Sequence, residues 1–151
     1  MPKTSVRQAV LADLAVLAPL FDGYRRFYGR APDVAAAEAF LRERFAHGES
    51  IVFLAHVEGV PAGFTQLYPS FSSVSLARTF ILNDLFVVPD QRRTGVGSAL
   101  LRAATDHARA LGAVRVTLNT DIQNTSAQAV YEARGWKRDR EYFVYHFLPQ
   151  E

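Results

Sequence analysis

The pattern of hydrophobic and polar residues at the beginning of the chain predicts one short strand followed by two helices. Residues 5–10 have the composition of a strand. Apolar residues then recur at intervals of three and four over residues 11–28, which predicts an amphipathic helix with a bend at Pro19. Asp33 stands where it can cap a second helix that continues to about residue 47. One strand and two helices are therefore expected before the main sheet.

The middle of the chain is rich in β-branched and aromatic residues. Three strands are predicted there, and the turn at residues 58–61 joins the first two into an antiparallel hairpin. Apolar residues again recur at intervals of three and four over residues 96–111, which predicts a helix. Gly112 is a residue that typically ends a helix. The three strands cover residues 51–57, 62–70 and 76–88.

The pattern of the last part of the chain predicts a strand over residues 114–119, followed by a short helix and then two final strands. The strand at 114–119 follows a helix, so a right-handed crossover would place it parallel to the strand before that helix. The short helix covers about residues 124–133, and the final strands lie around residues 136–137 and 142–147. The whole pattern predicts one α/β domain over residues 1–151 with a mixed sheet.

Composition narrows the class of protein. A chain of 151 residues with 49% hydrophobic and 21% charged residues can bury an ordinary core. It has no apolar run of 18 residues and no signal-peptide pattern, so a cytoplasmic location without a membrane partner is expected. With no cysteine and four scattered histidines, we expect no disulfide and no metal site. The net charge of +2 is dispersed, so nucleic acid is not an expected partner.

The segment at residues 84–98 has the pattern of a phosphate-binding turn. A strand-like apolar run passes through Arg92 and the glycines Gly95 and Gly97 into a helix. The start of a helix offers unpaired N–H groups and the positive end of its dipole to an anion. The Gly-Lys-Ser/Thr ending of a P-loop and the third glycine of a dinucleotide turn are both absent, so neither of those nucleotide sites is predicted.

Two segments together resemble the GCN5-related N-acetyltransferase (GNAT) family, which transfers acetyl from acetyl-CoA to amines. The first is Arg92-x-x-Gly95-x-Gly97. The second, from Asn124 to Trp136, is similar to the family pattern Asn-x-x-Ala-x-x-x-Tyr-x-x-x-Gly-Phe/Trp. The resemblance implies the acyl-CoA N-acyltransferase fold, in the order strand, two helices, three strands, helix, strand, helix, two strands. The nearest pattern is that of the diamine/polyamine branch.

The resemblance also implies acetyl-CoA as co-substrate. Loop backbone groups would bind its pyrophosphate, with Arg92 or Arg93 supplying charge. The strands flanking the helix at 96–111 would splay apart for the pantetheine arm, and a bulge near residues 85–87 would free backbone groups to bond it. Asn124 would bond the pantetheine, cap its helix, or do both. The implied cofactor residues are Leu85, Phe86, Val87, Arg92, Arg93, Thr94, Gly95, Val96, Gly97, Ser98, Asn124, Ala127 and Tyr131.

Acyl transfer to an amine needs a base, an oxyanion donor and an acid for the leaving thiolate. Tyr131 matches the family's general-acid tyrosine, although packing of its ring is the alternative. A backbone N–H of residues 85–87 would stabilise the oxyanion. Where the diamine branch reads Leu-Glu-Asp, this chain has Asn83, which cannot accept a proton. Asp84 is the candidate base, but it would face the opposite side of a regular strand; a structural carboxylate or a water relay are the alternatives.

The acceptor is expected to be a small amine, an amino-acid-like metabolite or a peptide amine. The resemblance makes Tyr24, Phe27 and Tyr28 candidate walls of its pocket, while core packing is the stronger expectation for at least two of them. A non-catalytic acyl-CoA-binding or regulatory domain is the alternative function, favoured by Asn83 and opposed by Tyr131. Dimers are common in the family, so a homodimer is also an expectation, and the sequence does not indicate which edge would pair.

Overall fold

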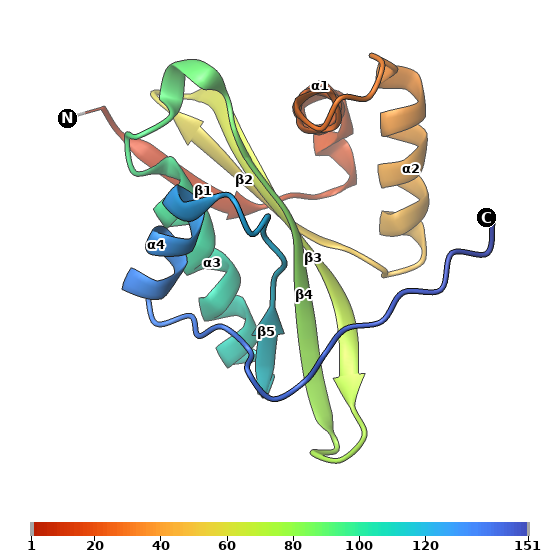
Figure 1. Ribbon diagram of the computed structural model, residues 1–151. Helices are drawn as coiled ribbons and strands as arrows, with labels where there is room; N and C mark the ends of the chain where they lie inside the picture. Colours follow the sequence, from red (N-terminus) through yellow and green to blue (C-terminus); the bar gives the residue numbers. More distant parts are fainter. Residues whose placement is uncertain (1, 151) are drawn as a thin grey trace. The chain divides into compact units, whose positions relative to one another are not determined.

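The computed structural model describes residues 2–150, which fall into two units (Figure 1). The first unit ends at Leu118 and the second begins at Asn119. The first contains β1 (Thr4–Gln8), a 3₁₀ turn (Leu11–Asp13), α1 (Leu14–Phe27), α2 (Val34–Ala46), β2 (Ile51–Val57), β3 (Val60–Ser72), β4 (Ala77–Val87), a second 3₁₀ turn (Pro89–Gln91), α3 (Val96–Ala110) and β5 (Arg115–Thr117). The second contains α4 (Thr125–Ala133).

The strands form one mixed sheet in the order β1-β2-β3-β4-β5. Strands β1 to β4 are antiparallel neighbours, whereas β5 lies parallel to β4 after the crossover through α3. The structure thus confirms the predicted mixed α/β sheet. It also confirms Asp33 as the cap of α2, because the carboxylate of Asp33 accepts a hydrogen bond from the backbone N–H of Ala36 at 3.0 Å.

The two final strands predicted at residues 136–137 and 142–147 are wrong. Within the described chain, no strand lies between Trp136 and Gln150. High β-propensity is not sufficient, because a strand exists only where its backbone N–H and C=O groups bond to a neighbouring strand. This segment has the side chains of a strand but no strand neighbour among the described residues.

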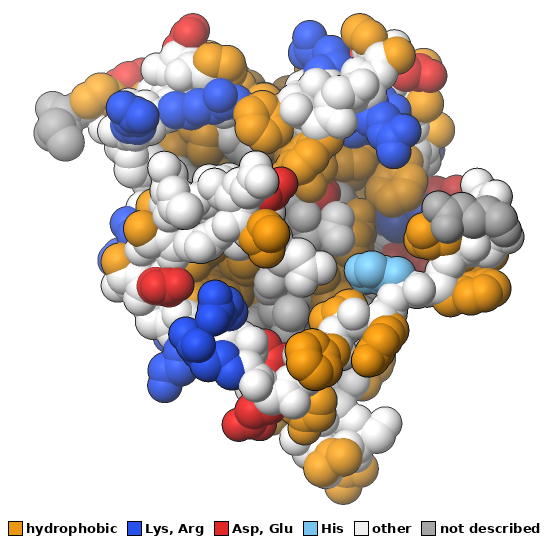
Figure 2. All heavy atoms as spheres, viewed as in Figure 1, with side chains coloured by type: hydrophobic (Ala, Val, Ile, Leu, Met, Phe, Trp, Pro, Cys, Tyr) orange, Lys and Arg blue, Asp and Glu red, His pale blue; other side chains and the backbone are white. Residues whose placement is uncertain are grey.

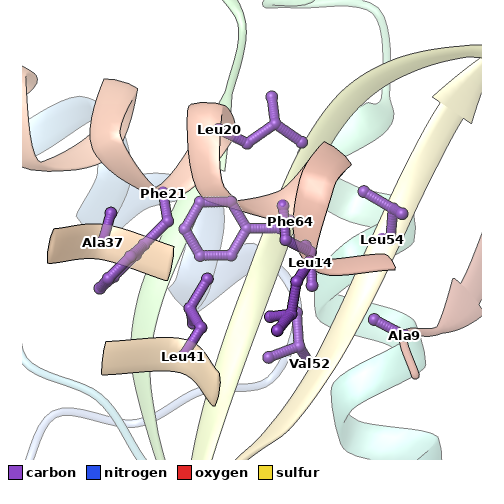
Figure 3. Close-up of a cluster of buried hydrophobic side chains, with 10 residues drawn as sticks. Ala9, Leu14, Leu20, Phe21, Ala37, Leu41, Val52, Leu54 and Phe64 are labelled. Atoms are coloured by element: carbon purple, nitrogen blue, oxygen red, sulfur yellow. The ribbon is translucent and has the colours of Figure 1, made fainter. Parts of the chain in front are cut away.

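Helices cover both faces of the sheet in the first unit (Figure 1). On one face α1 and α2 enclose the core cluster around Phe64 that Figure 3 shows. On the other face lies α3, where the ring of His107 contacts the rings of Phe53 and Phe80. Because successive strand residues point to opposite faces, the neighbours of Phe53 belong to the first cluster. That cluster comprises Ala9, Leu14, Leu17, Leu20, Phe21, Ala37, Leu41, Val52, Leu54 and Phe64.

Gly63 on β3 allows the close approach of β3 to β4. A Cβ at this position would lie 2.5 Å from the carbonyl oxygen of Phe86 and 3.2 Å from the Cα of Val87. Both are backbone atoms, which no side-chain rotation can move. We therefore expect Gly63→Ala to lower the free energy of unfolding by about 1–3 kcal/mol in urea denaturation. The control is Gly97→Ala, where the nearest atom to the new Cβ is 3.9 Å away; equal loss in both variants would contradict the prediction.

Candidate active site

Strand β4 carries one extra residue opposite β3. Gln66 pairs with Asp84 whereas the next residue, Leu67, pairs with Leu82, so Asn83 is bulged out of the ladder. The bulge predicted near residues 85–87 is therefore wrong in position. Those residues pair regularly with Gly63–Thr65.

The bulge decides which face of the sheet Asp84 occupies. In a regular strand Asp84 and Leu82 would share a face. With the extra residue they point to opposite faces, and Asp84 shares the face of Phe86. Phe86 packs against the cluster beneath α1 and α2. The expectation that Asp84 faces the opposite side of a regular strand is therefore wrong, because the bulge at Asn83 makes this strand irregular.

Asp84 is a buried carboxylate held by neutral donors. It is 2% exposed. Its Oδ2 accepts a hydrogen bond from Nε2 of Gln66, and its Oδ1 accepts one from Nδ2 of Asn83 at 2.8 Å. The hydroxyl of Tyr24, beside this carboxylate, donates to the carbonyl of Asn83 at 3.2 Å. Burial raises the pKa of Asp84, and the hydrogen bonds from Gln66 and Asn83, with a smaller effect of the nearby Tyr24 hydroxyl, offset only part of that rise.

Gln66 is a site residue that the sequence analysis missed. Its side chain is completely buried on β3. While its amide nitrogen donates to Asp84, its Oε1 accepts a hydrogen bond from the hydroxyl of Ser50 at 2.5 Å. Ser50 thereby fixes which end of the amide faces the carboxylate. The available signal was a glutamine two positions after Phe64, on the same face of the strand as the buried Ala62 and Phe64.

The predicted phosphate-binding turn lies between β4 and α3. Gly95 caps α3 with a φ of 91°, and Arg93 also has a positive φ of 63°. The hydroxyl of Thr94 donates to the carbonyl of Gln91 at 2.5 Å, which closes the turn. Helix geometry leaves the N–H groups of the first turn of α3 without intrahelical acceptors. A Cβ at Gly97 would meet only Val87, so packing within the chain does not require glycine there.

Arg92 is engaged inside the first unit. Its Nε donates to the carbonyl of Val87 at 2.9 Å. Its guanidinium lies over the rings of Phe27 and Phe86, 5.5 and 5.7 Å from their centroids. Arg93 is exposed. Arg92 is exposed as well, so the two arginines differ in the contacts of Arg92 with Val87, Phe27 and Phe86 rather than in exposure.

Strand β4 has an open stretch on its β5 side. Pairing with β5 covers only Thr79–Ile81 on β4. From Leu82 to Val87, β4 has no strand partner on that side among the described residues. The end of pairing agrees with the expected separation of these two strands, and it leaves backbone groups of β4 available to a ligand.

The three aromatic residues predicted for the acceptor pocket lie at the end of α1. Tyr24 is half-buried and packs against Phe64. Phe27 and Tyr28 are 64% and 67% exposed, and their ring centroids lie 5.4 Å apart. The expectation that at least two of the three pack in the core is wrong, because the last turn of α1 continues past the cluster that buries its earlier residues.

The second unit holds the other predicted motif. The Oδ1 of Asn124 accepts a hydrogen bond from the N–H of Ala127 at 3.1 Å, which confirms the capping interpretation of this residue. Tyr131 is half-buried on α4, and its ring lies 6.1 Å from that of Trp136. The N–H of Trp136 donates to the carbonyl of Tyr131 at 3.0 Å, which closes the end of the helix.

Comparison with known proteins decides the family. The profile of the acetyltransferase (GNAT) family matches residues 17–136. The chain belongs to this family. This GNAT protein is 48% identical over 141 residues to an uncharacterized N-acetyltransferase, YhfO, of Bacillus subtilis (strain 168), with 93% of this chain and 95% of the relative covered. Family membership makes it an acyltransferase that uses acetyl-CoA.

Two further similarities concern the fold and a named activity. A crystal structure of a probable acetyltransferase has a TM-score of 0.91 and 42% identity, covering 95% of this chain and 97% of that chain. An aminoglycoside N(6')-acetyltransferase type 1 of Stenotrophomonas maltophilia is 28% identical over 151 residues, covering 97% of this GNAT chain and 94% of the relative. Nothing in these similarities singles out the diamine/polyamine branch.

The described residues of this GNAT protein include neither a metal-binding group of side chains nor a membrane-spanning helix. Residues 2–150 contain no group of three or more His, Cys, Asp or Glu side chains that could hold a metal ion. In the same range, no helix is long and apolar enough to cross a membrane.

Proposed function

We propose that this GNAT protein transfers the acetyl group of acetyl-CoA to a primary amine by direct attack in a ternary complex. Asp84 acts as the general base and Tyr131 as the general acid. The observation that carries the proposal is the bulge at Asn83, which turns a buried carboxylate toward the face of the sheet beneath α1 and its aromatic residues.

The base must take a proton from the acceptor, because an alkylammonium has no lone pair for attack. A lysine-like amine has a pKa of about 10.4 and is almost fully protonated at neutral pH. The raised pKa of Asp84 makes it a stronger base than an ordinary aspartate. The proton passes to Asp84 directly or through one water. Its neutral hydrogen-bond donors leave its charge available to an incoming cation.

The remaining steps are cofactor binding at the turn before α3, stabilisation of the oxyanion, and protonation of the leaving thiolate by Tyr131. The turn at residues 91–98 and the start of α3 bind the pyrophosphate, and a backbone N–H of residues 85–87 stabilises the oxyanion of the tetrahedral intermediate. As the carbon–sulfur bond breaks, Tyr131 donates its phenolic proton to the CoA thiolate. A phenol of pKa about 10 can protonate a thiolate whose parent thiol has a pKa of about 8.5 when the two are held in contact.

The acceptor we propose is an amine attached to an apolar or small polar body. The support is the aromatic pair Phe27 and Tyr28, which is exposed at the end of α1 and would contact such a body beside Asp84. Aromatic faces also attract a cationic amine before it loses its proton. The panel should include a diamine, an aminoglycoside, an amino-acid amide and a lysine peptide. The diamine tests the branch that reads Leu-Glu-Asp where this chain has Leu82-Asn83-Asp84, a departure that argues against a strict polyamine substrate, and the aminoglycoside follows from the Stenotrophomonas relative.

The test is a calorimetric titration with acetyl-CoA, followed by the amine panel with a thiol reagent that reports free CoA. The chain has no cysteine, so the protein adds no thiol background. Binding together with amine-dependent release supports the proposal and begins to identify the acceptor. Binding without release from any amine would favour the regulatory alternative, and absence of binding would contradict the cofactor site.

The pH dependence of kcat/KM tests the role of Asp84 as general base, and a substitution of Gln66 is the change that should shift it. A general base acts when deprotonated, so kcat/KM rises as pH rises through its pKa. The hydrogen bond from Gln66 lowers that pKa. We therefore expect Gln66→Met to move the acidic limb of the kcat/KM profile to higher pH.

Thr65→Val is the matched control for Gln66→Met. Thr65 is equally buried, and its hydroxyl donates at 2.8 Å to the backbone carbonyl of Asp84 rather than to the carboxylate. This variant should leave the position of the limb unchanged, whatever it does to stability. A limb that stays in place in Gln66→Met, or moves equally in both variants, would remove Asp84 as the titrating base.

A further inference from the structure

Arg92, in the turn between β4 and α3, contacts an aromatic residue of α1 and another of β4. Its guanidinium carbon lies 5.5 Å from the centroid of the Phe27 ring and 5.7 Å from that of the Phe86 ring. Its Nε donates to the carbonyl of Val87 at 2.9 Å, which fixes the orientation of the planar group. Figure 2 shows Lys and Arg side chains next to hydrophobic ones at the top of the view, where Figure 1 places this turn. Arg92 therefore connects the turn to the end of α1.

The guanidinium of Arg92 is held without a carboxylate. Within residues 2–150 its side chain forms no ion pair, so its partners are one backbone carbonyl and the faces of two rings. A rotation of this side chain toward a phosphate would break the hydrogen bond with Val87 and remove the guanidinium from both rings. These contacts favour a role in which Arg92 stays where it is and acts on the rings.

Phe27 is the ring whose position depends most on Arg92. It is the last residue of α1 and is 64% exposed, so core packing does not select one rotamer for it. The helix itself is held close to β4 one turn earlier, because a Cβ at Gly23 would lie 3.2 Å from Cζ of the Phe86 ring. The backbone at the end of α1 is thus fixed by packing, while the direction of the Phe27 ring is fixed by the guanidinium of Arg92.

Aromatic contacts continue from Phe27 to the candidate base. The ring of Phe27 lies 5.4 Å from that of Tyr28, and the ring of Tyr28 lies 5.0 Å from that of Tyr24. The hydroxyl of Tyr24 donates to the carbonyl of Asn83 at 3.2 Å, beside the carboxylate of Asp84. A change in the direction of the Phe27 ring would therefore alter the aromatic surface that leads to the base.

We propose that Arg92 is a positioning residue for the acceptor amine, because it holds Phe27 in the direction that forms the aromatic wall beside Asp84. This role rests on the proposed function, since it takes Phe27 and Tyr28 as walls of the acceptor pocket. A wall that is already ordered in the free protein costs less entropy when the amine binds. Arg92 thus contributes to amine affinity, although it lies in the turn proposed to bind the cofactor.

The test separates amine affinity from cofactor affinity. Arg92→Lys keeps the charge, but a lysine cannot lie flat against two rings while it donates to Val87. Calorimetry with saturating CoA, which has no acetyl group to transfer, should show the Kd of the best amine of the panel raised roughly threefold to tenfold. KM for that amine should rise equally with kcat largely retained, and the Kd of acetyl-CoA should not change. Urea denaturation checks that the variant is folded.

Arg78→Lys is the matched control. Arg78 is also exposed, and its guanidinium lies 5.6 Å from the centroid of the Phe71 ring, at the far end of β4. The control therefore removes the same kind of contact away from the site, and it should leave both Kd values and KM unchanged. A double-mutant cycle then identifies the partner of Arg92. In a Phe27→Leu protein, whose amine Kd should already be raised, Arg92→Lys should add no further increase.

The outcomes distinguish this role from the proposed function. An unchanged amine Kd in Arg92→Lys, a weaker acetyl-CoA complex in that variant, an equal effect of Arg78→Lys, or full additivity with Phe27→Leu would each overturn the role of Arg92. Any of these results in a protein whose wild type acetylates an amine would leave the proposed function intact. A wild type that neither binds nor acetylates any amine of the panel would overturn both.

Discussion

Gly97→Glu is expected to abolish acetyl-CoA binding while the protein stays folded. Gly97 lies in the first turn of α3, and a Cβ there would meet only Val87 at 3.9 Å. The longer side chain can therefore extend away from the protein. It would fill the approach to the helix start and place a negative charge at the proposed pyrophosphate site. Isothermal titration calorimetry should detect no heat of binding, and urea denaturation should give a midpoint close to that of the wild type.

Ala110→Glu is the matched control for this change. Ala110 is exposed at the opposite end of α3, and the substitution adds the same charge and similar bulk. It should bind acetyl-CoA like the wild type, although a negative charge at a helix C-terminus costs about 0.3–1 kcal/mol of stability. Retained binding in folded Gly97→Glu protein, or equal loss in both variants, would mean that the turn at residues 91–98 is not the pyrophosphate site.

Tyr131→Phe should lower kcat by about 10²-fold, which is the ordinary contribution of a positioned general acid. The change removes one hydroxyl and keeps the ring, so the contact with Trp136 in the second unit is retained. The affinity for acetyl-CoA should therefore change little. Steady-state kinetics at saturating acetyl-CoA and amine give the loss in kcat, and a calorimetric titration gives the affinity.

The same substitution at Tyr142, also in the second unit, serves as a control because that tyrosine belongs to neither predicted motif. Tyr142→Phe should keep the wild-type kcat. A pre-steady-state burst measurement is needed beside these assays, since slow CoA release would hide a slower chemical step. Wild-type kcat in Tyr131→Phe, with no burst in either protein, would exclude Tyr131 as the acid.

The elements that surround the site could be predicted because their signals are local. The cap at Asp33 and the glycine after α3 act within a few residues of the helix ends that they define. The turn at residues 91–98 depends likewise on Gly95 and on the start of the following helix. Hydrophobic period and turn chemistry are properties of neighbouring residues, and they remain readable without the rest of the fold.

The face occupied by Asp84 could not be predicted in this way. It depends on one extra residue in the pairing of β3 with β4, and the side chain that holds the carboxylate, Gln66, lies 18 positions earlier in the chain. Nothing within β4 marks Asn83 rather than residues 85–87 as the bulge, because the register is a property of the pairing between two strands. The raised pKa of Asp84 follows from the same assembly, since desolvation requires the surrounding layers.

Residues 142–147 show where a local sequence signal predicts an element that the structure does not form. Their composition alone is that of a strand, yet the described chain forms none there. The propensity of a residue for a strand is a local property, whereas pairing needs a second backbone with free N–H and C=O groups at the correct distance. The order of the elements from β1 to α4 and the turn between β4 and α3 could therefore be predicted from the amino-acid sequence. The face occupied by Asp84 and the contacts of Arg92 depend on parts of the chain that are distant in the sequence.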